Sequence, residues 1–131
     1  MNLQAAQSAK ELSDDNFNLA YKLYKENNYH HWVVVILFYA ACSLINAICE
    51  IENIPVPERH KGRWDIKSGR YIKGLLDIAK QYLGTKAYNS YSFLQVQSQL
   101  LRYKPEIILK FKMDTNIQKI SAQYFKEFDI S

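Results

Sequence analysis

The stretch from Trp32 to Cys49, WVVVILFYAACSLINAIC, contains no charged residue, although the sequence on either side of it is charged and polar. Buried strands are typically about 4 to 8 residues long, so a run of this length fits a helix of roughly five turns. A helix that is apolar on nearly every side must be surrounded by lipid or by other helices. The stretch therefore either spans a membrane or forms the centre around which the rest of the chain folds.

Three polar side chains inside the run favour a core helix of a soluble protein. Tyr39, Ser43 and Asn46 stand at positions i, i+4 and i+7, which places them in one polar stripe along a helix. Four residues after Asn46, the stripe continues to Glu50. A membrane-spanning helix is the alternative, because about 18 uncharged residues meet its lower limit. We expect a central helix that ends near Glu52, packs against other helices and does not enter a membrane.

The composition predicts helices joined by few turns, because 131 residues contain only 4 glycines and 3 prolines. Apolar residues recur at helical spacing in four further segments. These predicted helices span Ala5 to Glu26, Asp65 to Tyr82, Ala87 to Tyr103 and Asn116 to Phe128. Ser13 could begin a second helix within the first segment, and Ile107–Phe111 fits either an extended piece or a helical turn. The sequence thus predicts one all-α domain over 1–131, an up-and-down bundle of four to five helices.

The two cysteines, Cys42 and Cys49, lie on the central helix. Their spacing of seven residues puts the Cα atoms roughly 10 Å apart in a helix, which is too far for a disulfide. Buried free thiols are typical of a reducing compartment. The N-terminal region has no cationic stretch followed by a short apolar core, as a signal peptide would. We therefore expect a cytoplasmic protein.

A loop that contains two prolines follows the central helix. Pro55 and Pro57 are incompatible with a helix interior and restrict the residues before them, so we expect a loop from Asn53 to Arg63. A loop of about ten residues is longer than most connections, and such loops often carry function. The window Arg59–Lys73, which starts in this loop, holds six basic residues and one acidic residue. This local net charge of +5 can attract phosphate.

His60 lies inside the basic window and is the predicted catalytic base. A neutral imidazole can take a proton from a ribose 2′-hydroxyl, and Arg63 can hold the phosphate and stabilise the transition state. The polar stripe could line the same site. The predicted phosphate-binding residues are Arg59, Lys61, Lys67, Arg70 and Arg102. Two alternatives remain: a solvated or ion-paired loop for His60 and Arg63, and packing against a neighbouring helix for Arg102.

Motifs that would indicate metal or nucleotide chemistry are missing from the sequence. The glycines are isolated, so they form no phosphate-cradling loop. The three histidines show neither an HExxH motif nor a Cys/His ligand spacing. We therefore predict no metal and no cofactor, and metal-free RNA cleavage is the chemistry that these residue types can support.

Short motifs along the chain resemble those of the small prokaryotic HEPN-like proteins. They are Trp32-Val33-Val34, Phe38-Tyr39-Ala40-Ala41, Asn46-Ala47, His60-Lys61-Gly62-Arg63, and Tyr91 through Ser98 to Leu101-Arg102-Tyr103. The resemblance covers roughly residues 15 to 104. It implies a bundle of four or five helices, frequently dimeric. The superfamily includes metal-independent ribonucleases, toxin subunits and antiviral effectors, besides members that only bind or scaffold.

The chain departs from the nuclease members of this superfamily. Those members carry an arginine four to six residues before a histidine, and no arginine stands at that distance before His30, His31 or His60. Ser43 and Asn46 stand where small relatives tend to have a histidine and an aspartate. We expect a homodimer that binds RNA or nucleotide phosphate at the basic loop, with metal-independent endoribonuclease activity as a further expectation. The alternative is a non-catalytic module of toxin–antitoxin or antiviral type, which pairs as a homodimer or with a nucleotidyltransferase-like protein.

Overall fold

A computed structural model of the protein describes residues 2–27, 29–103 and 113–130. Within these residues the chain forms five helices and one two-stranded antiparallel sheet. The elements are α1 (Leu3–Lys25), α2 (His30–Glu52), β1 (Arg63–Asp65), β2 (Arg70–Ile72), α3 (Leu75–Leu83), α4 (Thr85–Tyr103) and α5 (Asn116–Lys126). The predominantly helical architecture is confirmed, and the sheet is an addition that the all-α prediction lacks. The ambiguous segment Ile107–Phe111 lies outside the described residues.

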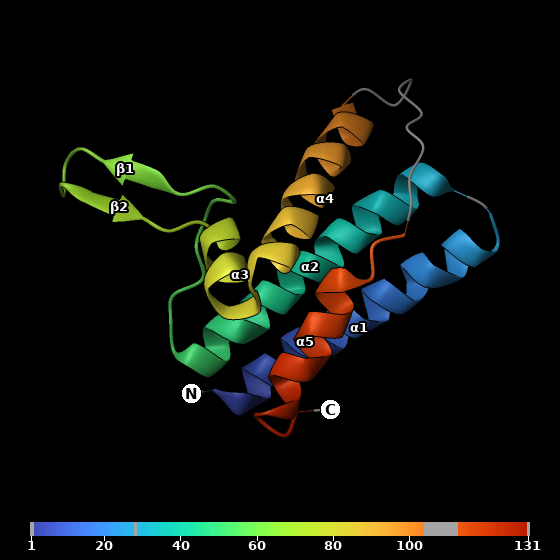
Figure 1. Ribbon diagram of the computed structural model, residues 1–131, viewed down its shortest axis with the longest axis horizontal. Helices are drawn as coiled ribbons and strands as arrows, with labels where there is room; N and C mark the ends of the chain where they lie inside the picture. The colour runs from blue at the N-terminus through green and yellow to red at the C-terminus, as the bar shows by residue number, and fades with distance from the viewer. Residues whose placement is uncertain (1, 28, 104–112, 131) are drawn as a thin grey trace.

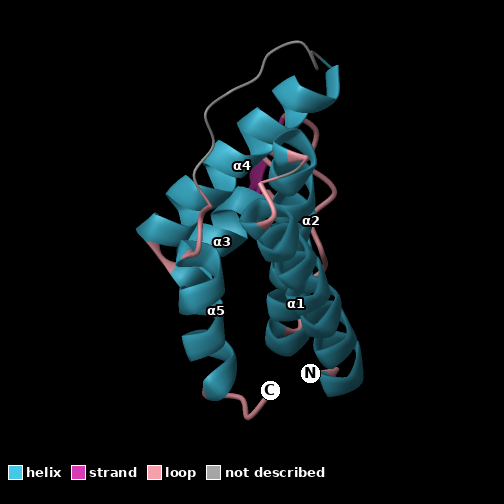
Figure 2. Ribbon diagram, turned by 90° about the vertical axis from the view of Figure 1, so that its right-hand side faces the viewer, coloured by secondary structure: helices cyan, strands magenta, loops and turns pink. Residues whose placement is uncertain are grey.

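Helix α2 forms the centre of the hydrophobic core. Of its 23 residues, 14 are buried. Figure 1 shows α1 running antiparallel alongside α2, with α4 crossing above it. Figure 2 shows α5 opposite the α1–α2 pair, with both chain ends at the same end of the bundle. The predicted burial of the central helix is confirmed.

By length and apolar composition, α2 is also the one helix among the described residues that could span a membrane. Inside the protein, 72% of its most apolar 18-residue window is buried. The neighbouring helices therefore cover most of the apolar surface that lipid would otherwise have to cover.

The first helix is continuous, so Ser13 does not start a second one. Its hydroxyl instead donates a 2.6 Å hydrogen bond to the carbonyl oxygen of Ala40 on α2. One turn away, the partly buried ammonium of Lys10 lies 2.8 Å from the carboxylate of Asp14. The Lys10 ammonium also lies 5.7 Å from the centre of the Phe125 ring on α5. These contacts join α1 to both α2 and α5.

The prediction of a helix from Asp65 to Tyr82 is wrong in its first half, where the chain forms a β-hairpin. The turn is closed by the amide of Gly69, which donates to the Asp65 carbonyl at 2.9 Å, and by the Ser68 hydroxyl, which donates to the Asp65 carboxylate at 2.7 Å. Gly69 has a φ of +65°, a conformation that other residues adopt only at a cost. Local side-chain hydrogen bonds and a left-handed glycine thus outweigh the helical spacing of the apolar residues.

The hairpin is fixed to the start of α3 through Tyr71. Its hydroxyl donates to the Asp77 carboxylate at 3.0 Å, and the same carboxylate accepts the amide of Gly74 at 2.8 Å. Gly62 lies directly under this contact, and a Cβ atom there would collide with the Tyr71 hydroxyl. Glycine at position 62 therefore permits the hairpin to reach α3.

The loop before the hairpin is held by the main chain of α3. The first amides of the helix, those of Leu75 and Leu76, donate to the carbonyl oxygens of Arg59 and His60 at 3.0 and 2.9 Å. Amides in the first turn of a helix have no partner within the helix, so the loop satisfies two of them. This backbone pairing sets the position of His60.

Candidate functional site

His60 lies between α2 and α4, where it is partly buried. Its ring centre is 5.2 Å from that of Phe38 on α2 and 6.1 Å from that of Tyr91 on α4. The Nδ1 atom is 2.9 Å from the Tyr91 hydroxyl oxygen. The residue that the sequence singles out as a base is therefore held against the bundle by side chains from two helices.

Tyr91 connects His60 to a thiol. The Tyr91 hydroxyl is completely buried and lies 3.4 Å from the Cys42 sulfur. Burial raises the pKa of Tyr91 and that of the Cys42 thiol, so both groups keep their protons near neutral pH. If Nδ1–H donates to the Tyr91 oxygen, the hydroxyl can donate onward to Cys42 and Nε2 keeps its lone pair. If instead the Tyr91 hydroxyl donates to Nδ1, the proton of the neutral ring lies on Nε2. The Nε2 atom of a neutral His60 can thus accept a proton in the first tautomer and donate one in the second.

Arg102 lies on the same side of α2. Its guanidinium carbon is 5.8 Å from the ring centre of Phe38 and 5.9 Å from that of Tyr39. Nη1 donates to the Tyr39 hydroxyl at 3.2 Å, and Nε donates to the Ser98 carbonyl at 3.3 Å. The structure thus shows the packing alternative for Arg102, which also places its charge beside the Phe38 ring that contacts His60.

Burial lowers the pKa of His60 below its ordinary value of 6.5, and the nearby positive charge of Arg102 lowers it further. Both effects disfavour the protonated ring. Burial removes water that would solvate its positive charge, and the Arg102 guanidinium repels that charge. His60 is therefore neutral near pH 7, which is the protonation state that a general base requires.

The polar stripe of α2 meets this site at one end. Tyr39 is exposed and bonded to Arg102, Asn46 is half-buried, and Ser43 is buried. The loop returns along the bundle, so that His60 contacts Phe38 rather than the end of α2 near Glu50. Of the three stripe residues, Tyr39 is thus the one with a described contact to the His60–Arg102 region.

Arg63 lies on β1, where its guanidinium is 3.8 Å from the carboxylate of Asp65. It lines a pocket of about 450 Å³ between the proline loop, the hairpin and α3. Apolar side chains of Ile54, Val56, Ile72 and Ile78 line this basic pocket together with two prolines, and its cations are Arg59, Lys61, Arg63 and Lys73 against the single acid Glu58. The structure therefore gathers two predicted phosphate-binding residues, Arg59 and Lys61, with the predicted catalytic residue Arg63, and adds Lys73.

Lys67 and Arg70 lie elsewhere on the hairpin and are exposed. Lys67 is in the turn and Arg70 is in β2, paired in register with Asp65. Phe38, Cys42 and Tyr91 were not predicted as site residues. Their apolar or aromatic character and helical spacing are typical of core residues, so only the fold reveals that they surround His60.

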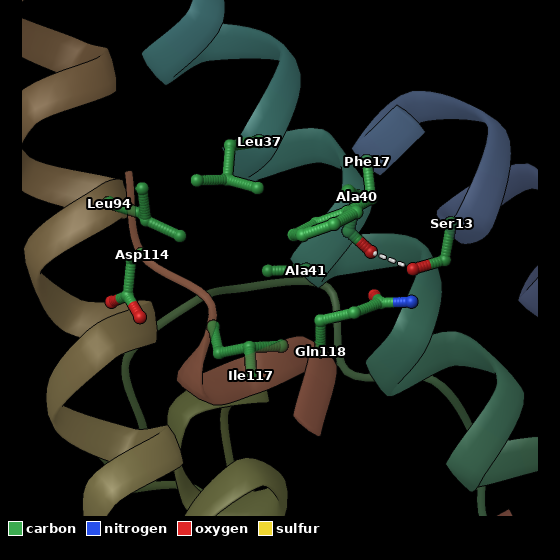
Figure 3. A pocket seen from close by; sticks show the side chains of 9 residues that line it. All are labelled: Ser13, Phe17, Leu37, Ala40, Ala41, Leu94, Asp114, Ile117 and Gln118. Carbon is green, nitrogen blue, oxygen red and sulfur yellow. Dashed lines mark hydrogen bonds between the residues drawn. The ribbon is translucent and has the colours of Figure 1, made fainter. Parts of the chain in front are cut away.

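The small cavity in Figure 3 is not a ligand site. It lies among α1, α2, α4 and the start of α5, and it has a volume of about 10 Å³. That is roughly the space one water molecule needs. Across the described ranges, no group of three His, Cys, Asp or Glu side chains is arranged to hold a metal ion.

These observations define a helical bundle that carries a basic β-hairpin and a partly buried cluster of His60, Tyr91 and Cys42. Comparisons of the chain with protein-family models, curated proteins and solved structures find no match.

Proposed function

We propose that this protein binds RNA through the phosphates that the basic pocket can hold. The observation that carries the proposal is the pocket itself, where four cations surround an apolar lining of about 450 Å³. A volume of this size is typical of small-ligand sites and can admit a nucleotide unit of an RNA strand. The cations supply the attraction for phosphate, and the apolar lining can contact a base or ribose.

The helical bundle is compatible with the HEPN-like architecture that the sequence motifs imply, and we propose that the protein is a cytoplasmic member of that superfamily. The motif residues Phe38, Tyr39, His60 and Arg102 lie together in space although they are far apart in the sequence. Their proximity supports a common site.

The test of RNA binding is a titration of a fluorescently labelled RNA with the purified protein at several salt concentrations. We expect affinity to fall steeply with salt, because each neutralised phosphate releases counterions. Engagement of the four pocket cations would give a slope of roughly −3 to −4 in a plot of log K against log salt. No binding at the lowest salt concentration would contradict the proposal.

A second candidate activity is metal-independent RNA cleavage, and the neutral His60 beside Arg102 is the observation that favours it. We expect mixed cellular RNA to be cleaved in excess chelator, and His60→Ala to lower the rate by about 10²- to 10⁴-fold. The rate should rise with pH through the pKa of His60, below 6.5, and then level off. Arg102→Gln should move that rise to higher pH.

The control for this cleavage assay is His31→Ala, because His31 is exposed at the start of α2. Arg63→Ala tests the other predicted catalytic residue, through loss of phosphate binding at the pocket. RNA that stays intact with the unaltered protein would remove the cleavage activity and leave the binding proposal in place.

The alternative function is an interaction module, and exposed apolar residues on α1 favour it. Leu12 and Leu19 are exposed and lie seven residues apart, on one face of the helix. Such a row can pair with a second copy of the chain or with a nucleotidyltransferase-like partner. A dimeric mass in light scattering, together with a flat RNA titration, would favour this alternative.

A further inference from the structure

The two faces of the β-hairpin carry different side chains. Trp64 pairs in register with Tyr71, and directly opposed residues of an antiparallel pair lie on the same face. The neighbouring pair, Arg63 and Ile72, lies on the other face, which lines the basic pocket. The hairpin therefore presents Arg63 to the pocket and two aromatic rings on its outer face.

Both rings of the outer face are accessible. Trp64 is 62% exposed and Tyr71 is 53% exposed. Figure 1 shows the hairpin extending away from the helices. An exposed tryptophan contributes nothing to a core, and burying it against a partner would remove a large apolar area from water.

One of the two rings, that of Tyr71, is held in place. The hydrogen bond from the Tyr71 hydroxyl to Asp77 ties β2 to the first turn of α3. A side chain that is already ordered loses little conformational entropy on binding, so Tyr71 is pre-arranged to contact a ligand.

Charge distinguishes between the partners that could cover an aromatic surface. The exposed cations Lys61, Lys67, Arg70 and Lys73 lie on the hairpin or beside it. The acid within the hairpin, Asp65, is already bonded to Ser68 and lies near Arg63. A partner with flat apolar faces can stack on the rings, and regularly spaced negative charges on it can pair with the cations. Single-stranded nucleic acid has both properties.

We infer that the outer face of the hairpin stacks unpaired bases of single-stranded RNA, with Trp64 as the main stacking residue, while cations of the same hairpin hold the strand's phosphates. This inference rests on the proposed RNA binding and names its substrate class. A duplex hides all but its terminal base faces within its own stack, so along its length it can engage the cations but not Trp64.

The experiment uses the fluorescence of Trp64 in the Trp32→Phe variant, which leaves Trp64 as the only tryptophan. The probes are a labelled 12-nucleotide single-stranded RNA without internal pairing and a blunt RNA duplex of the same length. We expect the single strand to quench Trp64 fluorescence on binding and the duplex to leave it nearly unchanged. Circular dichroism of the variant should match that of the unaltered protein.

Affinity measurements with Trp64→Ala provide the second readout. We expect a loss of about tenfold or more for the single strand, since stacking of one base on an aromatic side chain contributes substantially to binding. Duplex affinity should change little, and Trp64→Phe should retain most of the single-strand affinity. The matched control is Phe93→Ala, which removes an exposed aromatic side chain from α4.

Single-strand binding without quenching, and with equal affinity for Trp64→Ala, would overturn the inference and leave the proposed RNA binding intact. Equal quenching by single strand and duplex would also overturn it. Failure of the proposed function itself would appear differently, as no binding of either RNA at low salt.

Discussion

Replacement of Arg63 and Arg70 together by glutamate is expected to weaken RNA binding by about two orders of magnitude at low salt. Each reversal changes the local charge by two, so the Arg59–Lys73 window falls from +5 to +1. Arg63 lines the basic pocket, and Arg70 is exposed on the neighbouring strand. The loss should shrink as salt is raised, because screening already weakens binding of the unaltered protein.

The matched control is the double variant Lys22→Glu and Lys119→Glu, which changes net charge by the same amount on α1 and α5. Both lysines are exposed and lie on elements other than the hairpin. If only overall charge attracts RNA, the two double variants will lose affinity equally, and the pocket will have no special role. Unfolding curves should be similar in both, because exposed charges contribute little to stability.

Phe38→Ala is expected to lower the free energy of unfolding by about 3–5 kcal/mol. Phe38 is 2% exposed, and its ring contacts those of His60 and Tyr91 and the guanidinium of Arg102. Truncation removes buried apolar area and leaves a cavity that the rigid helices α2 and α4 cannot fill completely. A urea titration followed by circular dichroism measures the change.

Phe93→Ala is the matched control for this stability measurement, because it deletes the same atoms from a side chain that is 46% exposed. We expect its cost to be well below that of Phe38→Ala, because little apolar area is removed from the core. An equal loss of unfolding free energy at the two positions would mean that Phe38 is packed no more tightly than Phe93.

The sequence predicts the helical parts of this fold well where one pattern dominates. The uncharged run predicts α2, because no other arrangement buries so many consecutive apolar residues. The start of α3 is predicted ten residues too early, since Ile72 fits the apolar spacing of the helix that follows it. The hairpin depends on the hydrogen bond from Ser68 to Asp65 and on the conformation of Gly69. The spacing of apolar residues does not reveal either feature.

The candidate site is only partly predictable for a related reason. His60, Arg63 and Arg102 could be named from residue type and local charge, because those properties belong to single positions. The contact of His60 with Tyr91 joins residues 31 positions apart and depends on how α3 turns the chain back toward the bundle. Composition and spacing contain no information on that turn. From the sequence alone, Tyr91 is therefore predicted to be an ordinary core residue.

The amide groups of Leu75 and Leu76, which donate to the carbonyls of Arg59 and His60, have a consequence for how this loop can diversify. Every residue type has the same main-chain carbonyl oxygen, so these two hydrogen bonds do not depend on which side chains the loop carries. The exposed side chains at positions 59 and 61 can thus change while these two hydrogen bonds are kept, whereas His60 is also held by its contacts with Phe38 and Tyr91. The helices therefore fix the backbone of this loop, while its exposed side chains can differ.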